Sequence, residues 1–291
     1  YPVGSPGFTV SGGWCRIPCG NEARFMSTPL INESIVRVRN GWSTIYCGQD
    51  VPLNRILAVL AEPGEVLKAS AKSQVRRCGE MVVKESRLAG GTGPFKHTLK
   101  RARYRQGWVA AHHLRANGIS VPTPLAYIER GALGIITGNI LVSTYLGGQQ
   151  NVETFLQMLI QRKAGADTIQ AFLGALAQAI NAFTDCGGRH GDMSGKNIFT
   201  ADGRHFSFID LDDVTLEDVY DEGLRMKNHV QLYDSFCDFL SDSVLVPFIT
   251  KLITSEQDLR VWMPRVREAQ MQRRELVEER WAREGRKGSS G

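Results

Sequence analysis

The chain has 291 residues, of which 42% are hydrophobic and 22% are charged, and a formal net charge of +5. These proportions are ordinary for a soluble globular protein with a core of normal size. No apolar run reaches the ~18 residues that a membrane span needs, and six scattered cysteines predict no disulfide framework. We therefore expect a cytoplasmic protein with reduced thiols. The basic charge favours an anionic partner, and no motif or aromatic platform predicts nucleic-acid binding.

Residues 1–60 hold a predicted β-hairpin and no recognisable chemistry. Residues 35–39 and 43–47 alternate between apolar and polar side chains and are joined by Asn40-Gly41, a favoured hairpin turn. We expect this hairpin to form an N-terminal extension outside the lobe that follows.

Three strands are predicted over residues 65–68, 75–78 and 81–84, and the last is an apolar run that ends at Lys84. The loop between the first two strands contains Ser70 and Lys72 and lacks the motif G-x-G-x-x-G. Its small residues still allow backbone N–H groups to approach a phosphate.

A helix is predicted over residues 97–117, in a segment that is rich in Lys and Arg. The stretch between Ser86 and Ile128 contains no Asp or Glu. One interpretation is a solvated helix face, and the other is a basic surface for a phosphorylated or membrane-surface substrate.

The remaining strands of a small lobe are predicted over residues 125–128 and 134–146. The last of them runs into a hinge, with Gly147-Gly148 at the boundary between two lobes. We expect an adenine ring to lie against the segment from Thr144 to Leu146.

The second half of the chain is predicted to be helical. Helices are indicated over residues 151–161, 169–183, 228–253 and 264–285. The last of these is highly charged, and Trp262, just before it, and Trp281 add apolar anchors. It is expected either to pack against the second lobe or to attach to a membrane interface.

The stretch 189–213 carries the strongest functional pattern. His190-Gly191-Asp192 is followed by four residues and Asn197, and a short strand then ends at Asp210. The catalytic loop of protein kinases has the form H-R-D-x-x-x-x-N and is followed by a metal-binding Asp. The alternative is an ordinary polar loop, since His, Asp and Asn are common in loops.

Phosphoryl transfer depends on positioning and charge neutralisation, which assigns a role to each residue of the pattern. Asp192 is expected to accept the proton of the attacking hydroxyl, and Asn197 with Asp210 to hold Mg²⁺ against ATP. Lys84 is expected to pair with the α- and β-phosphates. Lys196 is either a γ-phosphate ligand or an exposed loop lysine.

One part of this machinery is missing from the sequence. A helix Glu usually holds the catalytic lysine, and the predicted helix has none. Glu85 cannot easily substitute, because neighbouring strand residues point to opposite faces. Gln106 is the nearest polar candidate.

Together these patterns predict an α+β, bilobal, protein-kinase-like fold, with a small, mainly β N-lobe and a larger helical C-lobe. The expected divisions are an N-terminal extension over residues 1–60, an N-lobe over 61–146, and a C-lobe over 147–291 that ends in the charged helix.

From about residue 62 to 284 the chain resembles the bacterial lipopolysaccharide core kinases, the Kdo/heptose kinase family. The resemblance rests on Glu65-Val66-Leu67, Val82-Val83-Lys84, Arg105-Gln106-Gly107-Trp108, Gly118 to Pro124, His190 to Asn197, Phe208-Ile209-Asp210 and Leu259 to Met263. It implies that Lys84 and Asp210 bind Mg-ATP, Asn197 binds the metal and Asp192 is the base. It also implies a sugar hydroxyl of an anionic glycolipid as acceptor, met in peripheral contact with the inner face of the cytoplasmic membrane.

The chain departs from this family at two positions. Gly107 stands where relatives carry the helix Glu, and Asn228 stands where an Asp usually supports the catalytic loop. The form His190-Gly191-Asp192 also lacks the Arg that couples many protein kinases to activation-loop phosphorylation. Two alternatives stay open: a protein or small-molecule kinase of the same fold, and a nucleotide-binding pseudokinase that acts as an interaction module.

Overall fold

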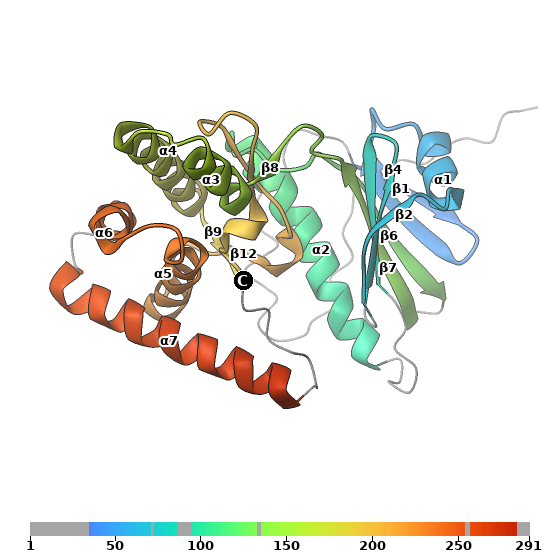
Figure 1. Ribbon diagram of the computed structural model, residues 1–291. Helices are drawn as coiled ribbons and strands as arrows, with labels where there is room; N and C mark the ends of the chain where they lie inside the picture. Colours follow the sequence, from blue (N-terminus) through green and yellow to red (C-terminus); the bar gives the residue numbers. More distant parts are fainter. Residues whose placement is uncertain (1–34, 71–72, 87–94, 133–134, 254–256, 284–291) are drawn as a thin grey trace, which may run out of the picture.

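The computed structural model describes residues 35–70, 73–86, 95–132, 135–253 and 257–283. They form two lobes, a mainly β small lobe and a helical lobe, with α2 between the sheet and the other helices (Figure 1). The predicted α+β, bilobal fold class is confirmed.

The small lobe is built on one antiparallel sheet of seven strands in the order β1-β2-β6-β7-β5-β4-β3. Its strands are β1 (Ile35–Asn40), β2 (Ser43–Gly48), β3 (Glu65–Ala69), β4 (Ser73–Cys78), β5 (Met81–Ser86), β6 (Pro124–Ala132) and β7 (Ile135–Thr144). The hairpin predicted between residues 35 and 47 is present. Its expected place outside the small lobe is wrong, because β2 pairs with β6 and extends the same sheet.

The two faces of the sheet pack against different helices. Alternate strand residues such as Val83 join a buried apolar cluster with Ile56 and Val59 of α1 (Leu53–Ala61). On the opposite face, Tyr127 of the sheet packs with Tyr104 and Trp108 of α2 (Phe95–Ala116). Since strand side chains alternate between faces, Lys84, next to Val83, lies on the α2 face.

The helical lobe surrounds the largest buried cluster. Its helices are α3 (Val152–Gln161), α4 (Ala166–Asp185), α5 (Glu222–Phe236), α6 (Asp242–Thr250) and α7 (Leu259–Arg283). Asn151 caps α3 as predicted, since its Oδ1 accepts a bond from the Thr154 amide at 2.9 Å. Short strands β8 (Gln150–Asn151), β9 (Gly188–His190), β10 (Ile198–Thr200), β11 (Phe206–Phe208) and β12 (Val214–Leu216) complete the lobe.

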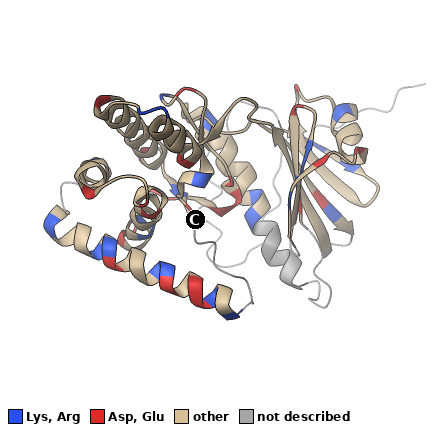
Figure 2. Cartoon of the chain, in the orientation of Figure 1, with Lys and Arg blue, Asp and Glu red and all other residues tan. Residues whose placement is uncertain are grey.

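The charged C-terminal helix, α7, packs on the helical lobe through one face and alternates in charge along its length (Figure 2). Trp262, Met263 and Val266 are buried, and Asp234 of α5 pairs with both Arg273 and Arg274. The helix begins five residues earlier than predicted and continues through Pro264. Within the described ranges, no helix is both long and apolar enough to cross a bilayer.

Candidate active site

The loop with the kinase-like spacing runs from β9 through a 3-10 turn, Gly195–Asn197, into β10. Buried His190 fixes its conformation. The Asp192 amide donates to His190 Nδ1 at 3.0 Å, so the proton on the other ring nitrogen, Nε2, is donated to the Ile209 carbonyl at 2.9 Å. Burial lowers the pKa of His190, which therefore stays neutral and ties this loop to the residue before Asp210.

Two amide side chains hold the Asp192 carboxylate. Gln231 Nε2 donates to Oδ1 at 2.9 Å, and Asn197 Nδ2 donates to Oδ2 at 3.0 Å. The other end of Gln231 accepts the Met193 amide at 2.9 Å. Gln231 was not predicted from the sequence, although its position three residues after Asn228 puts it near the same helix face.

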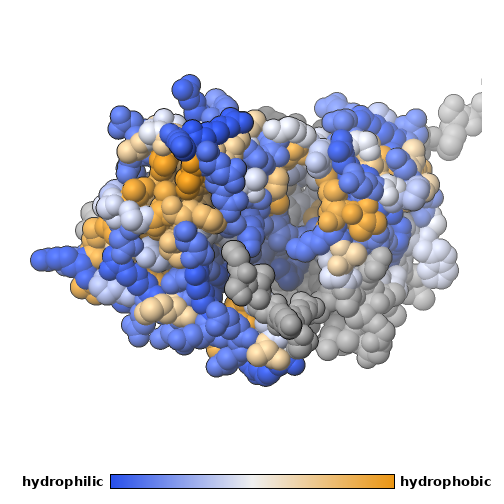
Figure 3. Space-filling view, in the orientation of Figure 1, coloured by the Kyte–Doolittle hydropathy of each residue, from blue (hydrophilic) through white to orange (hydrophobic). Residues whose placement is uncertain are grey.

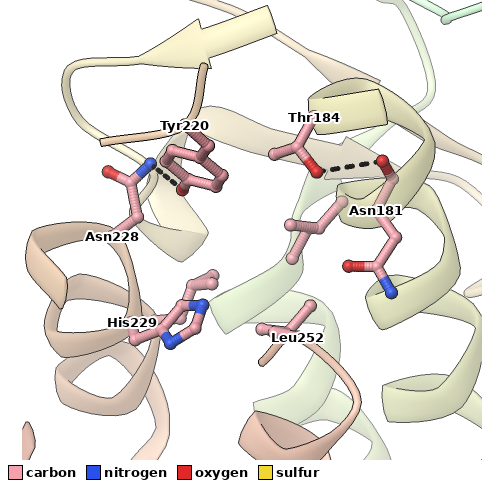
Figure 4. Close-up of a pocket in the computed structure, with 8 residues that line it drawn as sticks. Asn181, Thr184, Tyr220, Asn228, His229 and Leu252 are labelled. Carbon is pink, nitrogen blue, oxygen red and sulfur yellow. Dashed lines mark hydrogen bonds between the residues drawn. The ribbon is translucent and has the colours of Figure 1, made fainter. Parts of the chain in front are cut away.

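Asn228 does not support this loop. Its Nδ2 donates to the Tyr220 hydroxyl at 2.8 Å, and its Oδ1 is buried without a hydrogen-bond partner in the described part of the chain. It borders a cavity of about 10 Å³ between α4 and α5, also lined by His229 and Leu252 (Figure 4). Such a cavity holds about one water molecule, so it is too small for a nucleotide or a sugar.

The second loop of the site is a tight acidic turn after β11. Asp210 has a left-handed backbone (φ +61°) and begins the 3-10 turn Leu211–Asp213. Few non-glycine residues adopt this conformation, although Asp is among those that tolerate it. The turn places both Asp210 and Asp212 against Lys84, with 2.5 Å between Lys84 Nζ and Asp210 Oδ1.

The two carboxylates differ in exposure. The Asp210 side chain is 42% exposed, whereas that of Asp212 is 12% exposed. Burial alone would lower the pKa of Lys84, but the carboxylates outweigh it and raise that pKa. Burial also opposes ionisation of both acids. At Asp210 the Lys84 ammonium outweighs burial and holds the pKa well below its usual range. At Asp212 burial prevails, and the pKa is raised.

Neither residue considered as a substitute for the helix Glu contacts Lys84. Gln106 donates instead to the Val214 carbonyl at 2.8 Å. Glu85 pairs with Arg130 on the face of the sheet opposite to Lys84. The prediction for Gln106 is therefore wrong. Asp212, 128 residues from Lys84 in the chain, was missed.

The glycine between His190 and Asp192 is required by the acidic turn. The Gly191 amide donates to the Asp213 carbonyl at 2.7 Å. A Cβ at this position would lie 2.9 Å from that carbonyl oxygen and would also collide with the Asp213 carboxylate. A side chain at position 191 would thus displace the turn.

The remaining candidates lie around these two loops. Ser70 is exposed at the β3–β4 turn, where its hydroxyl bonds Ser73, and Lys72 lies outside the described residues. The Thr144 hydroxyl accepts the Thr123 amide at 2.8 Å, and Leu146 is half-buried. Lys196 is exposed in the 3-10 turn between β9 and β10.

Comparison with known proteins defines the family. Residues 91–260, more than half of the chain, match the model of the lipopolysaccharide kinase (Kdo/WaaP) family. The chain belongs to this family. Membership makes it a kinase that acts on lipopolysaccharide, and the resemblance predicted from the motifs is confirmed.

A solved structure agrees with the fold. The structure titled "WaaP in complex with acyl carrier protein" is 21% identical, with a TM-score of 0.59 over 75% of this chain and 92% of that chain. The bifunctional kinase-methyltransferase WbdD is more distant, at 14% identity and a TM-score of 0.43 over 68% of this chain and 42% of that chain. No match was found among curated protein sequences.

The family match covers only part of the candidate site. Asp192, Asn197, Asp210 and Gln231 lie within residues 91–260, whereas Lys84 precedes them. Lys84 is joined to the matched segment by its contacts with the acidic turn.

Around the junction of the lobes, the surface is mainly hydrophilic (blue in Figure 3).

Proposed function

We propose that this lipopolysaccharide kinase transfers the γ-phosphoryl group of Mg-ATP to a sugar hydroxyl, heptose or Kdo, of the lipopolysaccharide core. The observation that carries the proposal is the convergence of two loops. One holds Asp192 beside Asn197, and the other holds Asp210 against Lys84. The His190–Ile209 bond joins the two loops.

The residues present fit Mg²⁺. Asp210 is ionised and partly exposed, and Asn197 uses its amide nitrogen toward Asp192, which leaves its amide oxygen for a metal. Mg²⁺ prefers a few protein oxygens together with phosphate oxygens and water. The bound ion would neutralise charge that develops on the phosphates during transfer.

Each remaining residue has a defined task in this proposal. Asp192 accepts the proton of the sugar hydroxyl, with its carboxylate orientation fixed by the two amides. Lys84 orients the α- and β-phosphates, and exposed Lys196 approaches the γ-phosphate. The β3–β4 turn with Ser70 covers the phosphates, and Thr144 and Leu146 border the adenine.

The acceptor is expected at the inner face of the cytoplasmic membrane. Its anionic groups would be attracted by the basic surface of α2, where Arg103 and Arg105 are exposed. Peripheral membrane contact needs no spanning helix, and an interfacial segment is sufficient.

Transfer to purified core oligosaccharide tests this function. Incubation with protein and Mg-ATP is expected to add one phosphate to the oligosaccharide, and fragmentation in the mass spectrometer then assigns the phosphate to heptose or Kdo. Transfer to a protein or a small molecule instead would favour another kinase of the same fold. Nucleotide binding without any transfer would favour a pseudokinase.

The metal assignment has its own test. Asp210→Ala removes the exposed carboxylate and is expected to reduce transfer by at least about 100-fold, because charge neutralisation is a main part of phosphoryl-transfer catalysis. Asp185→Asn, an exposed change at the end of α4, is the matched control. Unchanged transfer by Asp210→Ala would show that Asp210 is not a metal ligand.

A further inference from the structure

Lys84 has no carboxylate partner on the helix that faces it. The sequence contains no Asp or Glu from residue 87 to residue 128, a stretch that includes all of α2. The ring of Tyr104, on α2, lies 5.9 Å from Lys84 Nζ. A negative charge for Lys84 must therefore come from another element.

Gly107 brings that element close. A Cβ on Gly107 would lie 2.9 Å from both the amide nitrogen and the Cα of Asp212, and 3.1 Å from the carbonyl carbon of Leu211. Real Cβ atoms do not approach backbone this closely, so the helix and the turn can pack in this way only with glycine at position 107. Position 107, where the helix carries no carboxylate, is thus the position that admits Asp212.

Two neighbouring side chains of α2 fasten the same turn. Arg103 contacts the Asp212 carbonyl at 3.5 Å and pairs with the Asp213 carboxylate at 3.1 Å. Gln106 bonds the Val214 carbonyl that follows. These contacts fix the backbone of the turn, and the Asp212 side chain is then left to face Lys84.

Lys84 contacts both Asp210 and Asp212, but only one of them is suited to remain with it. Asp210 is the more exposed and is the carboxylate assigned above to the metal, whereas Asp212 is nearly buried. When Asp210 serves the metal, Asp212 is the carboxylate left at Lys84 among the described residues.

We propose that Asp212 is the positioning residue for Lys84, in the role that a helix Glu has in other kinases, and that this arrangement requires glycine at position 107. The inference rests on the proposed kinase function. It assigns the role of carboxylate partner for Lys84 to Asp212, the second acid of Asp210-Leu211-Asp212, rather than to a residue of α2.

Asp212→Asn tests the proposal, with Asp185→Asn, at an exposed position at the end of α4, as the matched control. Asp212→Asn is expected to lower kcat by about 100-fold, because Lys84 loses its orientation. It is also expected to weaken binding of a non-hydrolysable Mg-ATP analogue in calorimetry. The Mg²⁺ concentration for half-maximal activity should stay the same, whereas Asp210→Asn should raise it.

A second readout needs no acceptor and no turnover. The pH profile of Lys84 acylation by an amine-reactive reagent, mapped by mass spectrometry, reports the pKa of Lys84. Loss of the Asp212 charge is expected to move this profile to lower pH. At a fixed pH below the pKa of Lys84, labelling should become about tenfold faster for each unit by which that pKa falls. Asp185→Asn should leave the profile unchanged.

Gly107→Ala keeps every carboxylate and provides an independent variant if Asp212→Asn folds poorly. Its methyl group displaces the turn, so it should reproduce the loss of kcat and the shifted labelling. Wild-type nucleotide affinity and labelling in Asp212→Asn would overturn the inference. If the labelling shifts but the wild type transfers no phosphate to core oligosaccharide, the proposed function fails while the placement of Asp212 stands.

Discussion

Asp192 depends on residues that carry no charge. Both of its carboxylate oxygens accept amide donors, from Gln231 on α5 and from Asn197 in its own loop. These neutral donors fix the direction of the carboxylate without forming an ion pair with it. In the proposed mechanism Asp192 takes up a proton during transfer, and a fixed direction of its carboxylate favours that step.

Gln231→Leu is expected to lower kcat while leaving the KM for ATP nearly unchanged. The variant frees Asp192 Oδ1 and leaves the Met193 amide unpaired. Misplacement of a catalytic group by about 1 Å can cost about 100-fold in rate, and a buried unpaired amide costs about 1–3 kcal/mol in stability. Steady-state kinetics and urea unfolding measure the two effects.

Asn228→Asp is the companion variant to this experiment. It restores the residue type expected from the family, but position 228 bonds Tyr220 and does not reach the loop. We expect no gain in kcat. An increase in kcat would mean that α5 supports the loop through position 228 rather than through Gln231.

At the scale of elements, the contact between α5 and α7 contains a buried histidine. His229 Nδ1 accepts the Trp262 indole N–H at 2.9 Å. Burial, together with the nearby Arg225, lowers the pKa of His229 to about 3. The folded protein therefore keeps this ring neutral at pH values where the unfolded chain protonates it.

This difference predicts acid destabilisation of the helical lobe. Between about pH 6.5 and pH 3 the unfolded chain binds one more proton at position 229, so stability falls as pH decreases, by up to about 1.4 kcal/mol per pH unit. His229→Asn keeps an acceptor for Trp262 and cannot titrate. Denaturant unfolding over this pH range should show a flatter loss of stability than the wild type. Parallel losses would contradict the assignment to His229.

The elements of the fold were largely predictable from local patterns. The apolar run that ends at Lys84, the periodicity of α4 and the Asn151 cap each lie within one short stretch and need no tertiary information. The continuous sheet was not predictable, because the pairing of β2 with β6 joins segments about 80 residues apart. Sequence patterns specify strands better than they specify strand neighbours.

The residues of the site likewise divide into those that local patterns predict and those that depend on long-range contacts. Asp192, Asn197 and Asp210 lie within one motif, so their spacing alone brought them together. Gln231 and Asp212 act across long sequence separations, with Gln231 39 residues from Asp192. Gly107 carried the available signal for Asp212, since a glycine inside a helix usually has a packing reason. Without the structure, that glycine indicates only that the helix Glu is missing.

For the whole molecule, the proposed nucleotide would contact both lobes and should stabilise the fold. At 100 times its Kd, Mg-ATP is expected to add about 2.7 kcal/mol of stability, or roughly 5–10 °C in Tm. Thermal unfolding with and without a chelator measures this effect. The shift should shrink for Asp210→Asn and remain for Asp185→Asn. An equal shift in all three proteins would place the nucleotide away from the acidic turn.

Gly191 has a further consequence for control of the enzyme. Many kinases are switched on when a phosphorylated loop engages the Arg next to the catalytic Asp. In this protein, the space that such an Arg would need is occupied by Asp213. Acquisition of the switch would require the acidic turn to be rebuilt, and with it the contacts of Lys84. The chain therefore has no room at position 191 for this form of control by phosphorylation.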